Sequence, residues 1–290
     1  MQTGKRLSFI AMALLSLGSG FTAVAAPWIV ENGEPNAEIV VAEKPARMAA
    51  MAADELRTYI RKITGAELAV VSTPTDEIPV RIYVGRSAYT DDLGVTDEGL
   101  KYGSFRMVSG PDYLVLLGYD FNFKPKEPFT MKGSPNSRAR KEMIRQWDEI
   151  SGSYWQNPMR SVHRFYHKEA GIWFHDGAGT FNAVCEFLRT LGVRWYMPGD
   201  LGEVVPEKSS IALPERNETV VADYPLRRWF GAYFAFDMDT LMWDLRMGIN
   251  SGYQTLGAGM HVHGMRLILS RRKMFALHPE YYAIGPHAKR

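Results

Sequence analysis

An amphipathic helix framed by strand-like runs is the feature that most constrains the fold of this chain. Apolar side chains recur there at intervals of three and four, the spacing of one helix face: Ala49, Ala52, Leu56, Tyr59, Ile60 and Ile63. Pro45 stands where a helix favours its first residue, and Gly65 where it favours the residue beyond its end. The runs 37–42, 67–71 and 80–85 are rich in β-branched residues and predict strands. This order predicts a sheet backed by a helix.

A second group of strands follows. The runs 105–109 and 113–119 are joined by Gly110-Pro111-Asp112, which predicts a β-hairpin because glycine, proline and aspartate favour tight turns. Together with the preceding helix and strands, the hairpin predicts an α+β domain over residues 27–222.

A second helix carries the only cysteine. Gly177-Ala178-Gly179 leads from a strand into a helix that ends at Leu191-Gly192. Cys185 lies on this helix among apolar residues, so we interpret it as a small buried hydrophobe rather than a nucleophile. With one cysteine, no disulfide can form within the chain. The glycine turn is not a dinucleotide fingerprint, because Asn182 occupies the third glycine position.

Residues 1–25 predict a secretory signal peptide. Lys5 and Arg6 form a positive start, residues 7–17 are an apolar core too short for a membrane anchor, and Ala23-Val24-Ala25 fits a cleavage site. We therefore expect a secreted or periplasmic protein that has no membrane span after cleavage. The chain has 34 basic and 32 acidic residues, and losing Lys5 and Arg6 leaves 32 of each. This balance gives no support for nucleic-acid binding.

Residues 124–168 differ from the rest in composition. Ten Lys or Arg residues stand against four Asp or Glu residues, four prolines interrupt the segment, and a helix is predicted at 137–150. Such a basic run suits an anionic ligand such as a uronate, but it is more typical of a solvated face. We predict an insertion that folds over a neighbouring part of the domain.

A linker at 222–225 predicts a domain boundary. It is followed by an extended run at 227–235, a helix at 238–247 and a further strand-like segment. Strand, helix and strand in this order are typical of the start of an α/β unit.

Several motifs are similar to those of a known group of proteins. They are an Asp-x-x-Gly-Thr turn at 176–180, the run LGVRWY at 191–196 and the run GEVVP at 202–206. Together they resemble the N-terminal domain of bacterial α-glucuronidases and, more distantly, of β-N-acetylhexosaminidases. The resemblance implies a sheet backed by helices, placed before a catalytic (β/α)8 barrel.

The segment 223–290 resembles the start of a glycosidase-like domain of unknown function found in large secreted bacterial proteins. The residues that carry this likeness are His261, His263 and the run HPEYY at 278–282. A (β/α)8 barrel takes ~250 residues, whereas only 68 follow Ala222. We therefore expect residues 223–290 to form the incomplete beginning of a barrel, and the chain to be a fragment of a longer protein.

The candidate substrate-binding residues lie after the linker. Arg227, Arg228 and Trp229 start the first predicted barrel strand, and an arginine beside an aromatic ring suits a uronate. An ordinary strand end fits the same residues equally well. Arg228 and Trp229 are the candidates that we retain.

The histidines provide the other candidates. His261 and His263 are two residues apart, so on a strand both point to the same side. This spacing suits contact with a sugar or a structural role, and it suits zinc less well, with His278 or Glu280 as a third ligand. We expect no metal and no cofactor.

Glycoside hydrolysis needs two carboxyl groups that flank the scissile bond. Asp237 and Asp239 open a helix, where acidic residues are stabilised, so we interpret them as structural. Asp244 lies in mid-helix and is expected to face solvent. Only Glu280 has an aromatic, loop-like setting suited to a site, so the catalytic pair stays unassigned.

These observations predict the N-terminal part of a secreted carbohydrate-active, glycoside hydrolase-like protein for uronosides or amino sugars, without turnover by this chain alone. The alternative is a non-catalytic glycan-binding or interaction module. A zinc-dependent hydrolase is less favoured. Carbohydrate is the expected partner, and nucleic acid is not.

Overall fold

The structure is a computed structural model. It describes residues 27–124, 138, 141–142, 145, 166–173, 175–224, 227, 237–250 and 276–281. The predicted signal peptide, most of the basic insertion and most of the predicted barrel segment lie outside these residues.

A six-stranded mixed sheet forms the centre of the described part, with the strand order β13-β6-β7-β5-β3-β4. The strands are β3 (Ala37–Val40), β4 (Val70–Val71), β5 (Val80–Val84), β6 (Phe105–Ser109), β7 (Tyr113–Gly118) and β13 (Asn217–Val220). β3 pairs in parallel with β4 and β5, and β5 with β7, whereas β6 pairs antiparallel with β7 and β13. The predicted hairpin is confirmed, and the strand predicted at 67–71 is reduced to β4.

Alternation along the strands gives the sheet two buried faces, because successive side chains point to opposite sides. The register aligns one apolar row on the first face, Ile39, Ile82 and Leu114. It aligns a second row on the opposite face, Val40, Tyr83 and Val115. Both faces therefore need a cover.

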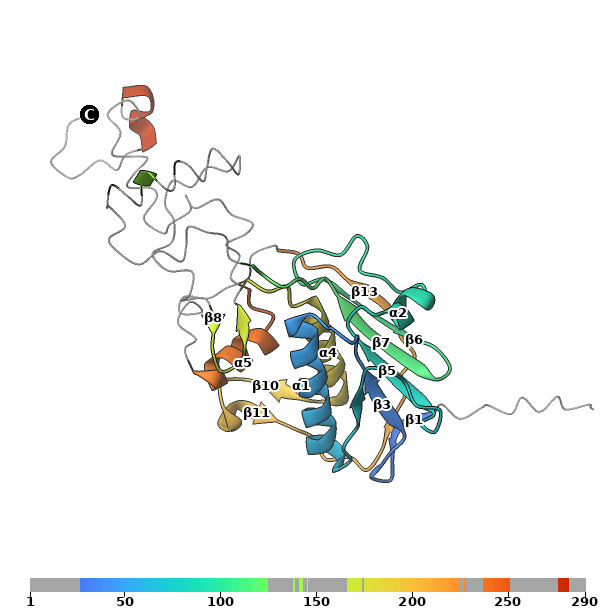
Figure 1. The fold of residues 1–290 in the computed structure, drawn as a ribbon. Helices are drawn as coiled ribbons and strands as arrows, with labels where there is room; N and C mark the ends of the chain where they lie inside the picture. Colours follow the sequence, from blue (N-terminus) through green and yellow to red (C-terminus); the bar gives the residue numbers. More distant parts are fainter. Residues whose placement is uncertain are drawn as a thin grey trace, which may run out of the picture.

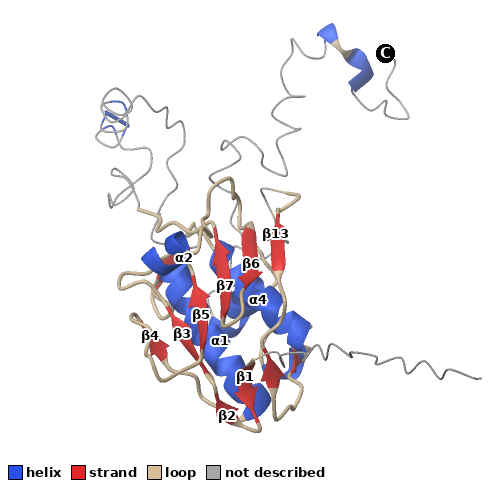
Figure 2. Ribbon diagram, turned by 90° about the vertical axis from the view of Figure 1, so that its right-hand side faces the viewer, coloured by secondary structure: helices blue, strands red, loops and turns tan. Residues whose placement is uncertain are grey.

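Helices α1 (Arg47–Thr64) and α4 (Gly179–Leu191) cover the first face (Figures 1 and 2). The predicted apolar stripe of α1 is buried throughout, and Gly65 ends the helix with a φ of 81°. Pro45 does not start α1, however, because Ala46 is still extended and helical geometry begins at Arg47. Cys185 is buried in α4 as predicted, and burial raises the pKa of its thiol.

Two glycines let α4 begin directly on β7. A Cβ on Gly118 would lie 2.0 Å from the carbonyl carbon of Gly179, and one on Gly179 would lie 2.2 Å from the backbone nitrogen of Tyr119. The hydroxyl of Thr180 accepts a hydrogen bond from the Gly118 N–H (3.0 Å). Asp120 Oδ1 accepts one from the Thr180 N–H (3.0 Å), so a residue beyond the end of β7 caps α4.

The aspartate of the Asp-x-x-Gly-Thr turn, Asp176, has a structural role. Asp176 accepts hydrogen bonds from the backbone N–H groups of Phe123 (2.7 Å) and Trp173 (2.8 Å). Arg47 forms a two-pronged ion pair with the same carboxylate, at 2.6 and 2.9 Å. With a side chain only 1% exposed, Asp176 joins the start of α1 to the turn that leads into α4.

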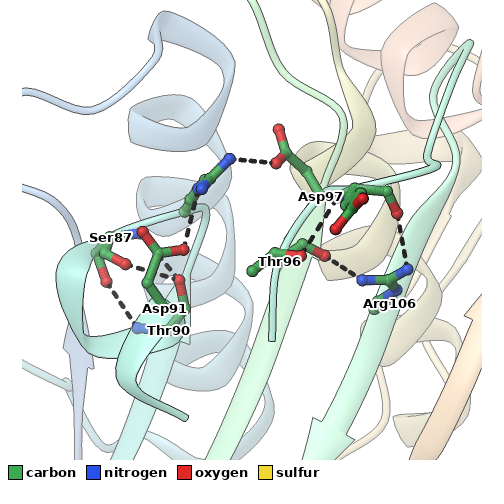
Figure 3. Close-up of polar contacts among 8 residues, drawn as sticks. Ser87, Thr90, Asp91, Thr96, Asp97 and Arg106 are labelled. Atoms are coloured by element: carbon green, nitrogen blue, oxygen red, sulfur yellow. Dashed lines mark hydrogen bonds and ion pairs between the residues drawn. The ribbon is translucent and has the colours of Figure 1, made fainter. Parts of the chain in front are cut away.

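The opposite face of the sheet is covered by α2 (Ala88–Asp92) and the loop that follows it. Ser87 and Thr90 form a reciprocal cap at the start of α2 (Figure 3). Arg86 then pairs with Asp91 (3.0 Å) and Asp97 (2.6 Å). Arg106 of β6 donates to two backbone carbonyls of the same loop, those of Thr96 and Glu98 (Figure 3). These contacts fix the loop on the sheet.

Smaller sheets border this core. One has the order β12-β1-β2 and consists of β1 (Trp28–Glu31), β2 (Glu34–Pro35) and β12 (Ile211–Ala212). The others are the pairs β8 (Tyr166–His167) with β9 (Ile172–Trp173), and β10 (Arg194–Trp195) with β11 (Glu203–Val204). The 3-10 helices η2 (Asp200–Gly202) and η4 (Pro279–Tyr281) are also formed.

Helix α5 (Met238–Arg246) packs against this domain although it follows the predicted linker. Asp237 caps it by accepting from the Thr240 N–H (2.9 Å), which confirms the structural role predicted for Asp237. Leu241, 1% exposed, joins the main core. Asp244 lies three residues further along on the same face and is 5% exposed, so the prediction that it faces solvent was wrong.

The described part is thus a mixed α/β fold whose sheet is backed by helices, as predicted for residues 27–222. The barrel strands predicted for 223–290 lie outside the described residues, and the truncated barrel stays a prediction. Within the part of the chain that the structure describes, no helix is both long and apolar enough to cross a membrane.

Candidate functional site

A pocket of about 270 Å³ lies where the sheet, α4 and the α5 segment meet. Its walls come from Gly103 and Phe105, from Asn182 and Arg189 on α4, and from residues 220–224, 227 and 246–248. Tyr224 on its wall is 71% exposed, so this side of the pocket meets solvent. The volume is near the lower end for small-molecule sites and suits one sugar unit or a ligand of similar size.

Arg227 is the most informative residue in this pocket. Its Nε donates to the Gly248 carbonyl (2.8 Å), and its Nη1 donates to the carbonyls of Tyr102 (2.9 Å) and Tyr224 (2.8 Å). A guanidinium carries five N–H donors, so these bonds leave the two on Nη2. Among the described residues, Nη2 makes no hydrogen bond and no carboxylate pairs with Arg227. Burial lowers the pKa of this guanidinium.

The absence of a side chain at residue 103 makes room for Arg227. A Cβ on Gly103 would lie 2.8 Å from Nη2 of Arg227 and 2.7 Å from Nδ2 of Asn182. The backbone at Gly103 has a φ of 85°, a region that favours glycine. The Asn182 amide donates to the Gly103 carbonyl (2.8 Å) and holds this wall against α4. Nη2 of Arg227 therefore occupies space beside Gly103 that any larger residue at position 103 would fill.

Two further arginines line the pocket, but each has a carboxylate partner. Arg246 pairs with Glu55 of α1, at 2.6 Å from Nε to Oε1 and 3.4 Å from Nη2 to Oε2. Arg189 pairs with Glu186 one helical turn away, at 3.1 Å, and also donates to the Arg246 carbonyl. Burial lowers the pKa of Arg246, but the hydrogen bond and charge of Glu55 outweigh this, so its pKa is raised.

Aromatic rings enclose the Arg246–Glu55 pair. The Arg246 guanidinium lies 5.3 Å from the ring centre of Tyr59 and 5.5 Å from that of Trp195. The Trp195 indole N–H donates to the Tyr59 hydroxyl (2.6 Å), and the two rings meet edge to face. With Glu55 6% exposed and Arg246 18% exposed, this cluster fastens α5 to α1.

The pocket is therefore equipped to bind an anion. A charged guanidinium with two N–H donors left on Nη2 can donate hydrogen bonds to a carboxylate or a similar oxyanion. Asp223, whose side chain is exposed, is the one acidic residue on the described walls. Because hydrolysis of a glycosidic bond needs two carboxyl groups, the described walls supply binding groups but not a catalytic pair.

The residues predicted from the sequence fall elsewhere. Arg228, Trp229, His261 and His263 lie outside the described residues. His278 and Glu280 adjoin each other at η4, with 3.0 Å between Nδ1 and Oε1, and neither lines the pocket. Their side chains are 43% and 58% exposed.

Sequence reasoning noticed Arg227 but did not retain it, and it missed Asn182 and Gly103 as site residues. In the sequence, Asn182 stands at the failed third glycine position of a nucleotide motif and just after the Asp-x-x-Gly-Thr turn, and neither setting indicates a ligand contact. The one usable signal was the RRW run, which places an arginine beside an aromatic residue.

Metal binding finds no support in the described part. No group of three or more His, Cys, Asp or Glu residues there is arranged to hold a metal ion. The expectation that the protein needs no metal stays a prediction.

The sequence and the fold were compared with those of known proteins. No family model matches the sequence, and neither does any curated protein. Among solved structures, the chain is similar to BtGH115A, described as a family GH115 4-O-methyl-α-glucuronidase with specificity for decorated arabinogalactans. The identity is 15% over 76% of this chain, with a TM-score of 0.45. The chain spans 25% of the length of that structure, and its function has to be inferred from its own residues.

Proposed function

We propose that this protein is a carbohydrate-active protein of the glycoside hydrolase-like class, and that the pocket around Arg227 binds a sugar that carries a carboxylate. The observation that carries the proposal is the guanidinium of Arg227, partly buried and paired with no described carboxylate, with two N–H donors still available. Secretion through the N-terminal segment is part of the same proposal and rests on the sequence alone.

A carboxylate supplies what this site lacks. Its oxygens accept from the N–H groups of Nη2, and its charge offsets the cost of partly burying Arg227 without a counter-ion. A neutral sugar accepts hydrogen bonds but brings no charge, so it compensates the guanidinium less. The pocket should therefore distinguish uronates from the corresponding neutral sugars.

The proposed role of the described part is binding rather than cleavage. Its pocket has one described acidic residue, Asp223, at an exposed position. We expect no hydrolysis of aryl uronosides or aryl hexosaminides by the purified chain. Turnover that scales with protein concentration and persists in an Asp223→Asn variant would locate chemistry elsewhere in the chain.

The test compares two ligands that differ only at one carbon. Methyl glucuronide and methyl glucoside, each as both anomers, would be titrated into the full chain by calorimetry, with ligand-observed NMR for weak binding. We expect the glucuronide to bind about tenfold more tightly or better. Equal affinities would refute carboxylate recognition, and binding of neither ligand would refute the carbohydrate proposal.

Arg227→Lys provides the matched variant. Lysine keeps the charge but loses the planar guanidinium, which bonds three carbonyls and thereby positions Nη2. Affinity for the glucuronide should therefore fall about tenfold while affinity for the glucoside stays the same. Arg57→Lys is the control, because Arg57 is an exposed residue of α1 paired with Asp54 and absent from the pocket. An equal loss in both variants would contradict the role of Arg227.

A further inference from the structure

We propose that Glu55, which does not itself line the pocket, sets the charge that the pocket can accept, so that it favours ligands with one negative charge over those with two. This inference rests on the proposed function, since it concerns the ligand of the same site. Glu55 would act through Arg246 as a specificity-determining residue, without touching the ligand.

The charges around the pocket support this assignment. Three guanidinium groups line it, those of Arg189, Arg227 and Arg246. Glu55 neutralises Arg246 through a two-pronged contact, and Glu186 neutralises Arg189 through a single one. Among the described wall residues, one uncompensated cation is left, Arg227. A single carboxylate balances that charge, whereas a phosphate monoester brings about two negative charges near neutral pH.

The position of Glu55 makes its effect stronger than that of Glu186. The Glu55 side chain is 6% exposed, and its partner Arg246 is 18% exposed. Glu186 and Arg189 are 41% and 31% exposed. Solvent screens the second pair far more than the first, because charges in a low-dielectric environment interact more strongly. Removing the charge of Glu55 should therefore change the field in the pocket, and removing that of Glu186 should change it little.

The acidic wall residue acts in the same direction. Asp223 is exposed and repels anions weakly through solvent. Its contribution adds to the preference for a single charge, but it does not replace that of Glu55, because an exposed carboxylate is screened by solvent and makes no contact with Arg246 like that of Glu55.

The experiment measures a ratio of affinities. Methyl glucuronide and methyl glucoside 6-phosphate place their charges at the same end of the sugar and would be titrated at pH 8, where the phosphate carries two charges. In the wild-type chain, we expect the glucuronide to bind more tightly. In Glu55→Gln, the ratio should shift about tenfold toward the phosphate, because the amide still accepts from Arg246 but no longer cancels its charge. In Glu186→Gln, the ratio should change by less than about twofold.

The outcomes separate this inference from the proposed function. A wild-type chain that binds the glucuronide, with an unchanged ratio in Glu55→Gln, overturns the role of Glu55 and leaves the proposed function standing. A wild-type chain that binds neither sugar overturns both. A general loss of affinity without a change in the ratio indicates that Glu55 only supports the fold, and it also overturns the inference.

A second variant covers the case in which Glu55→Gln does not fold. The double variant Glu55→Gln/Arg246→Gln removes both charges and keeps an amide pair that can form a hydrogen bond. Since the net charge near the pocket is then unchanged, the affinity ratio should stay within about twofold of the wild-type value. A tenfold change in either direction would contradict the inference.

Discussion

Two partly buried arginines near α5 have opposite surroundings. Arg246 faces the Glu55 carboxylate and two aromatic rings, whereas Arg227 donates to the carbonyls of Tyr102, Tyr224 and Gly248. The pKa of Arg246 is raised because the carboxylate outweighs burial, and that of Arg227 is lowered because nothing opposes burial. The first arginine is matched within the fold. The second is held in place by neutral dipoles and keeps its charge for a ligand.

Asp120 is an acidic counterpart of Arg227, since it too lacks an oppositely charged partner among the described residues. It accepts a hydrogen bond from the Thr180 N–H, and among the described residues it forms no ion pair. Burial raises the pKa of its carboxyl group to about 7, although that hydrogen bond opposes the shift. A charge that is desolvated and held only by neutral hydrogen-bonding groups thus shifts toward its neutral form, whichever its sign.

The largest effect should come from breaking the matched pair. Glu55→Ala leaves the Arg246 guanidinium buried without a counter-ion, which we expect to cost about 3–5 kcal/mol of the free energy of unfolding. Urea denaturation measures this. Asp54→Ala, which breaks the exposed pair with Arg57 on the same helix, is the control and should cost less than about 1 kcal/mol. Similar losses in the two variants would show that Arg246 depends little on Glu55.

A smaller effect should come from filling the space beside Arg227. Gly103→Ala adds a Cβ 2.8 Å from the guanidinium and 2.7 Å from the Asn182 amide. Gly99→Ala is the matched control, because Gly99 has a similar φ of 79° but nothing within 4 Å of the added carbon.

Both glycine variants should lose about 1–2 kcal/mol of stability through the left-handed backbone alone. Gly103→Ala should lose a further ~1–3 kcal/mol through crowding, and its affinity for methyl glucuronide should fall. If the two variants unfold at the same urea concentration, an added Cβ at residue 103 does not crowd Arg227 and Asn182, and the prediction is wrong.

A further effect, which depends on pH, should come from Asp120. Its folded pKa, about 7, exceeds the ordinary value of 3.8, so the folded state holds the proton more tightly than the unfolded state does. The stability that Asp120 contributes is complete below pH ~4 and is lost as the pH rises toward 7. His175 opposes this, because burial lowers its pKa to about 4 and costs stability as the pH falls below its ordinary value of 6.5.

A comparison of variants isolates the effect of Asp120. Asn can still accept from the Thr180 N–H but does not titrate. The difference in unfolding free energy between the wild-type chain and Asp120→Asn should therefore move in favour of Asn between pH 4.5 and 7.5, a range that includes the folded-state pKa of about 7. A difference that stays constant over this range would mean that Asp120 titrates near its ordinary value.

The sequence alone determined the local elements of the fold. The spacing of Ala52, Leu56 and Ile63 predicted the buried face of α1, Gly65 marked its end, and the Gly-Pro-Asp run predicted the hairpin of β6 and β7. Such features follow from nearby residues, since helical and strand periodicity decide which side chains share a face.

Tertiary structure alone decided the pocket and its charge. Glu55 and Arg246 are 191 residues apart, and Gly103 meets Asn182 from 79 residues away. Asp244 was expected in solvent but is buried, because α5 packs on the domain through the face that also carries Leu241. Whether a charged residue is matched or left for a ligand depends on which distant carboxylate the fold brings within about 4 Å. Sequence spacing cannot supply that distance, because it is set only once the sheet order and the docking of α5 are complete.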